Sequence, residues 1–240
     1  MFNFDRRTLY IIIGAILVIS LVGMGTEGLL GLLLTLPGVI IAITFHEFAH
    51  AWTAYRLGDD TPKYQGRLNL NPLSHIDPIG LIMLIVAHFG WGKPVQINPN
   101  NFRGKYSLSA SEAIVSVAGP VMNFIVAIVF AIIYMLIIKF AGIQFALTSM
   151  GNVLVSVIQY TIIVNVGLGV FNLIPLPPLD GSKILMHFLP YNAKVWFEEK
   201  SQIFYIVFLV LFITGIAGKI ISPIINFIYK AIMNGVGILF

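Results

Sequence analysis

Apolar residues form long, almost uninterrupted blocks along this chain, and polar stretches separate the blocks. A helix that crosses a bilayer needs about 20 mostly apolar residues, and these blocks are apolar on every face. The pattern therefore predicts an all-α polytopic membrane protein rather than amphipathic helices around a soluble core. About six membrane-spanning helices are expected, at residues 9–23, 28–55, 110–138, 150–174, 201–216 and 223–239.

The interval between the second and third spans has a different pattern. A polar stretch at 56–77 is followed by an apolar run at 79–89, which is too short to cross a bilayer and is typical of a re-entrant or interfacial segment. Asp77 and Pro78 mark a helix start, because aspartate caps free N–H groups and proline fits the first helical position. Residues 90–101 then alternate apolar and polar positions between prolines, which predicts a short strand or β-hairpin.

The composition supports a membrane protein and excludes several other classes. Hydrophobic residues make up 58% of the 240 positions and charged residues only 10%, whereas soluble domains carry about 25% charged residues. So few charged residues cannot cover the surface of a soluble globular protein. A disordered chain is also excluded, because it has low hydrophobicity and high charge. The absence of cysteine rules out disulfides, thiolate metal ligands and cysteine nucleophiles. The sequence contains no basic run with interleaved aromatic residues, the pattern that would indicate a nucleic-acid partner.

The placement of the basic residues predicts the orientation of the spans. Cytoplasmic loops of membrane proteins carry an excess of lysine and arginine. If the N-terminus is cytoplasmic, residues 56–105 and 181–200 lie on the same side of the membrane. We therefore expect a multi-pass protein of the cell membrane with both termini in the cytoplasm. These regions then hold 11 of the 14 basic residues: Arg6, Arg7, Arg56, Lys63, Arg67, Lys93, Arg103, Lys105, Lys183, Lys194 and Lys200.

The second span ends in the motif HEFAH at residues 46–50. His46 and His50 are one helical turn apart, so both imidazoles lie on one face and can reach a single Zn²⁺. Glu47 lies beside them, where it can act as a general base rather than a ligand. The motif alone is short enough to arise by chance. A charged residue at the centre of a membrane helix costs about 2.5–3.5 kcal/mol on insertion scales, however, which favours a functional reason for this group.

A proline-rich segment at the end of the fourth predicted span, NLIPLPPLDG at residues 172–181, supplies a candidate third ligand. Its prolines prevent a regular helix, and irregular backbone at membrane depth is tolerated only beside protein or water, so the segment is expected to line a cavity. Asp180 is its only acid, and a carboxylate completes a His₂-carboxylate zinc site that leaves a fourth position for water. The alternative is an ordinary helix-ending turn in which Asp180 caps the next helix.

The paired motifs resemble the site-2 protease family of intramembrane zinc metalloproteases. That family combines HExxH in a membrane helix with a later N-x-x-P-x-P-x-x-D-G segment, and both patterns are present here. A third match is GPVMN at residues 119–123, in the span between them. The resemblance covers about residues 28–185. It implies a single integral membrane domain over 1–240, of the compact kind without PDZ or CBS domains, with two additional C-terminal spans at 201–240.

The resemblance also implies an activity. His46, His50 and Asp180 would hold one Zn²⁺ per chain, and Glu47 would activate a zinc-bound water for hydrolysis of a peptide bond in or near a transmembrane segment. The expected partners are a transmembrane protein substrate and the lipid bilayer, with a regulatory membrane protein as a further candidate. No nucleic acid and no other cofactor are expected.

Other residues are weaker candidates for the site. Asn123 and Asn172 match asparagines of the family motifs, and either amide is a candidate to donate to the developing oxyanion or to hold the substrate backbone. For Asn123 the alternative is a hydrogen bond between helices, which is common in membranes. His75 is a candidate to contact the site from its loop.

Two other functions compete with proteolysis. A metal-ion transporter also places histidines and acids in membrane helices, but it predicts several sites along one pathway. A catalytically idle family member that acts as a binding scaffold is the second alternative, and it does not require the intact set of Glu47 and three ligands.

Overall fold

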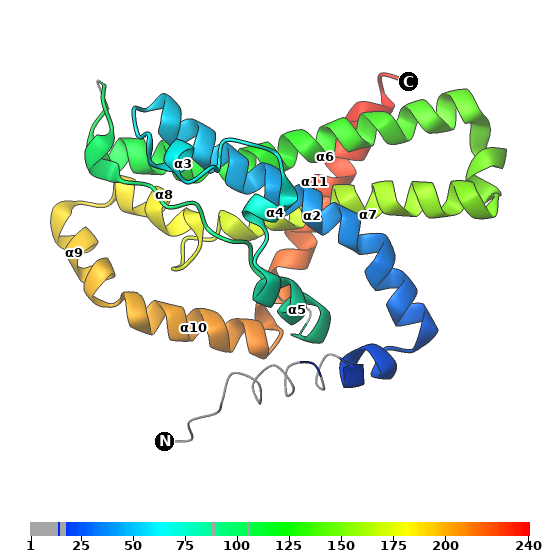
Figure 1. Cartoon of the computed structure of the whole chain (residues 1–240), viewed down its shortest axis with the longest axis horizontal. Helices are drawn as coiled ribbons and strands as arrows, with labels where there is room; N and C mark the ends of the chain where they lie inside the picture. Colours follow the sequence, from blue (N-terminus) through cyan, green and yellow to red (C-terminus); the bar gives the residue numbers. More distant parts are fainter. Residues whose placement is uncertain (1–13, 15–17, 88–89, 105) are drawn as a thin grey trace.

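The computed structural model describes residues 14, 18–87, 90–104 and 106–240, which fold into helices joined mostly by short loops (Figure 1). These residues contain no β-strand, so the predicted all-α class is confirmed. The elements are α2 (Gly25–Arg56), α3 (Thr61–Tyr64), α4 (Pro72–His75), α5 (Pro78–Ala87), a 3₁₀ turn η1 (Pro99–Asn101), α6 (Leu108–Leu147), α7 (Ser149–Asn172), α8 (Asp180–Phe188), α9 (Tyr191–Glu199), α10 (Ser201–Ile213) and α11 (Ile216–Gly237).

Four helices of the described part, α2, α6, α7 and α11, are long and apolar enough to cross a membrane, as befits an integral membrane protein. The six predicted spans are not all recovered, for two reasons. The span at 9–23 falls largely outside the described residues. Helix α10 has 13 residues, which at 1.5 Å per residue reach about 20 Å, less than the roughly 30 Å of a bilayer core.

Several predicted boundaries shift in the structure. Helix α6 continues beyond residue 138 to Leu147, and only Gly142, with φ of 77°, breaks its helical backbone. Helix α11 begins at Ile216 rather than at 223, because Pro223 is accommodated inside it. The stretch at 181–200, expected to be a loop, consists mainly of helices α8 and α9.

The region between α2 and α6 agrees with its prediction in part. The short apolar run forms helix α5, and the Asp77 carboxylate caps it by accepting the Ile79 N–H at 2.9 Å. The β-hairpin at 90–101 is not confirmed, because the described residues there form one isolated antiparallel bridge, between Ile76 and Gly92, followed by η1.

Helices α2, α6 and α7 form the centre of the molecule, where α6 and α7 run side by side as a helical hairpin (Figure 1). Ala127 and Ala131 of α6 pack against Ile162 and Val166 of α7, and α11 adds further apolar side chains to this core. Helix α2 approaches α7 closely at Gly38, where a Cβ atom would lie 2.8 Å from the Cα of Thr161. This packing fixes the C-terminal half of α2, which carries His46 and His50, against α6.

Candidate metal centre

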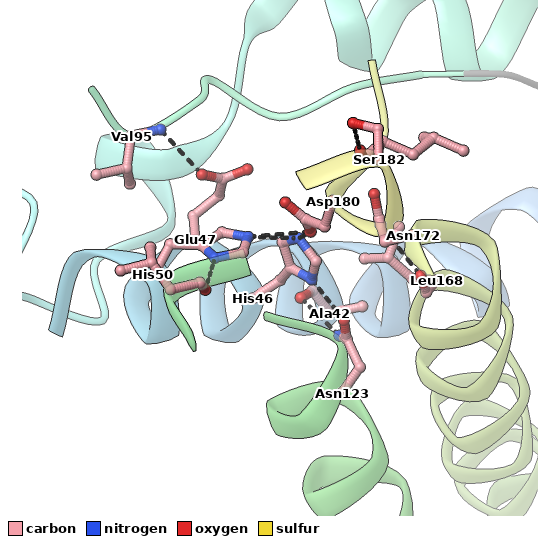
Figure 2. A network of polar contacts seen from close by, with 12 residues as sticks. Ala42, His46, Glu47, His50, Val95, Asn123, Leu168, Asn172, Asp180 and Ser182 are labelled. Atoms are coloured by element: carbon pink, nitrogen blue, oxygen red, sulfur yellow. Dashed lines mark hydrogen bonds and ion pairs between the residues drawn. The ribbon is translucent and has the colours of Figure 1, made fainter. Parts of the chain in front are cut away.

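Three side chains from distant parts of the chain converge at the centre of the molecule. His46 and His50 lie one turn apart near the end of α2, and Asp180 is the first residue of α8 (Figure 2). The Nε2 atoms of the two histidines are 3.0 Å apart, and each lies 3.2 Å from Oδ2 of Asp180. In the described part of the chain these three residues form the group whose donor atoms could hold a metal ion.

Asp180 reaches the histidines because the chain folds back sharply after α7. The proline-containing stretch between Asn172 and Asp180 ends α7 and leads into α8. Gly181 is required at this fold, since a Cβ atom there would collide with the carbonyl oxygens of Leu173 and Ile174. Glycine thus permits a close backbone approach that brings the Asp180 carboxylate to α2.

The protonation of the two histidines leaves their Nε2 atoms free to bind a cation. Nδ1 of His46 lies 2.7 Å from Oδ1 of Asn123, and Nδ1 of His50 lies 2.7 Å from the carbonyl oxygen of Val115. Both partners are acceptors, so each ring donates from Nδ1 and directs Nε2 towards the Asp180 carboxylate. Oδ2 of Asp180 is buried and has no hydrogen-bond partner. Three potential ligand atoms therefore face one another, an arrangement that a metal cation stabilises.

The dimensions of this group fit zinc. Two ligands at about 2.0–2.1 Å from a tetrahedral zinc ion lie about 3.3 Å apart, close to the 3.0–3.2 Å separations of the donors. Gly119 of α6 provides the space beside them, because a Cβ atom there would lie 2.5 Å from Nε2 of His50 and 2.6 Å from Cε1 of His46. Glycine at this position therefore lets α6 approach the two histidines closely.

Asn123 lies behind His46 and is fully buried. Its Oδ1 accepts from His46, and its Nδ2 donates to the carbonyl of Ala42 at 3.1 Å and to Oδ1 of Asn165 at 3.0 Å. Both amide hydrogens are thus in use, which leaves none for an oxyanion or a substrate backbone. The geometry instead supports a positioning role, in which Asn123 links helices and fixes the tautomer of His46. Asn165 was not singled out from the sequence, although a polar residue in an apolar span is a signal for such a role.

We expect Asn123→Ala to weaken zinc binding by about 10- to 100-fold, because it removes the acceptor that orients His46. Competition with a chromophoric chelator measures the affinity. Asn152→Ala is the matched control, since Asn152 is exposed on α7 and its side chain accepts from the hydroxyl of Ser156 in the same helix. Wild-type zinc affinity in Asn123→Ala would show that the hydrogen bond to His46 does not support the metal.

Glu47 points to the side of the histidines where residues 93–98 pass (Figure 2). Its Oε2 accepts the backbone N–H of Val95 at 3.0 Å. The same stretch is tied to the end of α2 by Asp59, whose carboxylate accepts from the backbone N–H of Asn98 at 2.7 Å and from Nδ2 of Asn101 at 2.9 Å. The stretch beside Glu47 is therefore held at Val95 by α2 and at Asn98 by the loop that follows α2.

The Asp59 carboxylate is anchored as an anion. Its burial alone would raise its pKa, but the hydrogen bonds from Thr61, Asn101 and Asn98 outweigh burial and hold the pKa below its ordinary value. A carboxyl group with a lowered folded-state pKa stabilises the fold above its unfolded pKa of about 3.9, and that contribution is lost as the pH falls through the folded-state pKa.

We therefore expect Asp59→Asn to lower the free energy of unfolding by about 2 kcal/mol near pH 7, the scale of hydrogen bonds to a charged group. The difference from wild type should shrink as the pH falls below about 4, where the carboxylate of the unfolded wild-type chain begins to protonate while that of the folded protein does not. Chemical denaturation in detergent micelles, repeated across this pH range, measures both quantities. A difference that grows towards low pH would contradict the assignment.

The other sequence candidates form their hydrogen bonds with groups other than the three converging donors. Asn172 is the last residue of α7, and its Nδ2 donates to the carbonyl of Leu168 at 3.0 Å. His75 is buried, but its Nε2 pairs with the carbonyl of Asn69 rather than with the site. Of the two remaining histidines, His187 lies 3.4 Å from the hydroxyl of Ser109, and His88 is outside the described residues.

Two histidines one turn apart, a carboxylate and a glutamate beside the first histidine are the parts of a metallopeptidase site. Residues 34–215 match the family model of Peptidase family M50. The chain therefore belongs to Peptidase family M50, the site-2 protease family, and it is a zinc metalloprotease.

Several curated proteins are similar to this chain. The "Putative zinc metalloprotease YwhC" of Bacillus subtilis is 40% identical over 188 residues, which cover 78% of this chain and 84% of that protein. The "Putative zinc metalloprotease Rip2" of Mycolicibacterium smegmatis is 31% identical over 183 residues, and that of Mycobacterium tuberculosis H37Rv is 29% identical over 188 residues. The matches cover 75% of this chain and 66% of each Rip2 protein. No solved structure matches the chain closely.

Proposed function

We propose that this protein is an intramembrane metalloendopeptidase that hydrolyses peptide bonds in or near transmembrane segments of other membrane proteins. The observation that carries the proposal is the depth of the convergent His46–His50–Asp180 group. His50 and His46 precede the end of α2 at Arg56 by six and ten residues, which places them about 9 Å and 15 Å inside an apolar helix. A hydrolytic site at that depth meets peptide bonds of membrane-embedded segments.

The catalytic roles follow from the chemistry of the side chains. We assign His46, His50 and Asp180 as the ligands of one zinc ion per chain. When bound, zinc supplies a Lewis acid that favours attack of water on the scissile carbonyl. Glu47 is the base, which takes a proton from the attacking water at a carboxylate oxygen and returns it to the amide nitrogen of the departing segment. The intact set of four residues supports an active enzyme rather than an idle scaffold.

A substrate helix must locally unwind before its backbone can reach Glu47. The stretch at 92–98 is suited to receive the unwound segment, because an extended peptide can pair with an exposed backbone edge. Support comes from the contact between Val95 and Glu47, which brings this edge to the proposed base. Asn172 lies beside the turn that carries the third proposed ligand. We propose that the second hydrogen of its amide is donated to the developing oxyanion.

We also propose the arrangement of the protein in the membrane. The excess of lysine and arginine at 56–105 and 181–200 supports a multi-pass protein with both termini in the cytoplasm. Water then reaches the site from the cytoplasmic side, along the polar loop that follows α2. We retain one integral membrane domain over 1–240, with its catalytic part at about 28–185 and additional spans in 201–240. A regulatory membrane protein stays a candidate partner.

Reconstitution in lipid vesicles tests the proposal. A reporter protein with one transmembrane segment is incorporated together with the enzyme, and mass spectrometry locates any cut. We expect cleavage in or near the transmembrane segment, and no cleavage of the same segment when it is fused to a soluble carrier in free solution. Efficient cleavage of the soluble fusion, with the membrane-embedded reporter left intact, would overturn the intramembrane assignment.

A further inference from the structure

An apolar cavity of about 340 Å³ lies between α2, α7 and α11, with further walls from α5 and α10. Its lining includes Ile43 of α2, Gly167 and Leu168 of α7, and Gly218 and Ile225 of α11. None of these residues belongs to the metal centre. The cavity is therefore a separate feature, and its place relative to Glu47 decides what it can bind.

The walls of the cavity continue directly into the catalytic site. Ile43 precedes Glu47 by one helical turn on the same face of α2. Gly92 packs against both residues. A Cβ atom on Gly92 would lie 2.7 Å from Cγ2 of Ile43 and 3.6 Å from Oε1 of Glu47. On the α7 side, the carbonyl of the lining residue Leu168 bonds to Asn172, next to Asp180 (Figure 2). The cavity thus lies one turn deeper in α2 than the proposed base.

The chemistry of the walls selects an apolar occupant. The residues named as lining the cavity include no aspartate, glutamate, lysine or arginine. The hydroxyl of Ser222 donates to the carbonyl of Gly218 within its own helix at 2.6 Å, so it offers its hydrogen elsewhere. An apolar protein cavity of about 150 Å³ is large enough to bind benzene, and this cavity is roughly twice that size. A side chain as large as phenylalanine fits.

We propose that this cavity is a specificity subsite, which receives a large apolar side chain of the substrate residue that flanks the scissile bond. The inference rests on the proposed function. In an extended segment, successive side chains point to opposite faces. A segment that passes along residues 92–98 with its scissile carbonyl at Glu47 directs one neighbouring side chain towards Ile43 and into the cavity. The enzyme therefore prefers leucine, methionine or phenylalanine at that position over alanine or a charged residue.

Gly167→Leu fills the cavity without disturbing the metal centre. A Cβ atom at Gly167 meets only Cδ1 of Ile225, at an ordinary contact distance of 3.7 Å, and leucine is a better helix former than glycine. Gly235→Leu is the matched control. Gly235 lies in α11, has no atom within 4 Å of its Cβ position and is not among the lining residues.

The experiment uses the vesicle assay with the full chain. Residues on both sides of the mapped cut are changed one at a time to Phe, Leu, Ala or Asp in the reporter. At one flanking position, wild type should cleave the Phe and Leu reporters about tenfold or more faster than the Ala reporter, the scale set by apolar pockets. Gly167→Leu should abolish or reverse this preference while zinc content stays near that of wild type. Gly235→Leu should keep the wild-type preference.

Three results would overturn the subsite. The first is a wild-type enzyme that shows no preference at either flanking position. The second is equal slowing of all reporters by Gly167→Leu, which would assign the cavity to a lipid chain or to the packing of the fold. The third is the same change of preference in Gly235→Leu. If zinc-loaded wild type cleaves no membrane reporter, the proposed function itself fails, and the subsite fails with it.

Discussion

Glu47→Gln is expected to reduce cleavage of a membrane reporter by about 10²- to 10⁴-fold, the contribution of a well-placed general base. Glutamine keeps the size of the side chain and a carbonyl oxygen that can still accept the Val95 N–H, but it cannot take a proton from water. The three donors of the metal centre are unchanged, so the variant should bind the same amount of zinc as wild type. Zinc content and cleavage rate are measured on one preparation.

Glu27→Gln is the matched control for this prediction. Glu27 lies in the first turn of the same helix, far along α2 from the histidines, and its replacement should leave both zinc content and cleavage unchanged. Normal cleavage by Glu47→Gln would contradict the assigned base. Loss of zinc together with cleavage would show instead that Glu47 supports metal binding rather than proton transfer.

Asp180→Ala is expected to have the second large effect, which is loss of most bound zinc together with cleavage. The variant removes the only carboxylate of the group and leaves two imidazoles, one donor fewer than the three protein ligands of catalytic zinc sites. Alanine also leaves the space of the side chain empty beside His46 and His50. Metal analysis after dialysis measures the zinc that stays bound.

An acid outside the group provides the control for Asp180→Ala. Asp60 precedes α3, and its side chain does not cap that helix, so Asp60→Ala should retain one zinc per chain and wild-type cleavage. Stoichiometric zinc in Asp180→Ala would exclude Asp180 as the third ligand. The ion would then depend on another residue near the histidines.

The part of the site that a single helix specifies was predictable from the sequence. The spacing of His46 and His50 places both rings on one face of any helix, and α2 does so. Asp180 was also found as a candidate, because the prolines before it prevent a helix and leave it as the segment's only acid. A tight turn at Gly181 was also expected, but the contact of Asp180 with α2 depends on how the whole segment folds back against that helix, which no local pattern contains.

The environment of these residues was harder to predict, because it depends on which partners the packing supplies. Asn123 was recognised, but an amide can donate or accept, and only the positions of Ala42, Asn165 and His46 show that both its hydrogens are engaged. Asp59 was not singled out at all. Its hydrogen bonds join the end of α2 to residues almost 40 positions further along the chain.

The elements whose sequence patterns are compatible with more than one structure were predicted least well. Alternation at 90–101 favoured a hairpin, yet a lone bridge to Gly92 is formed, since the prolines at 94 and 99 cannot donate to a ladder. The hydrophobic pattern at 201–216 predicted a membrane-spanning helix. The glycine at 215, with φ of 71°, separates α10 from α11 and leaves α10 short.

We propose that hydrolysis depends on one zinc ion at the His46–His50–Asp180 group. The most direct test is to strip the protein of metal with a chelator, reconstitute it in vesicles and titrate zinc while reporter cleavage is recorded. We expect no cleavage without metal, a rise in proportion to added zinc and a plateau at one zinc per chain. Full cleavage by protein that contains no measurable metal would contradict the account.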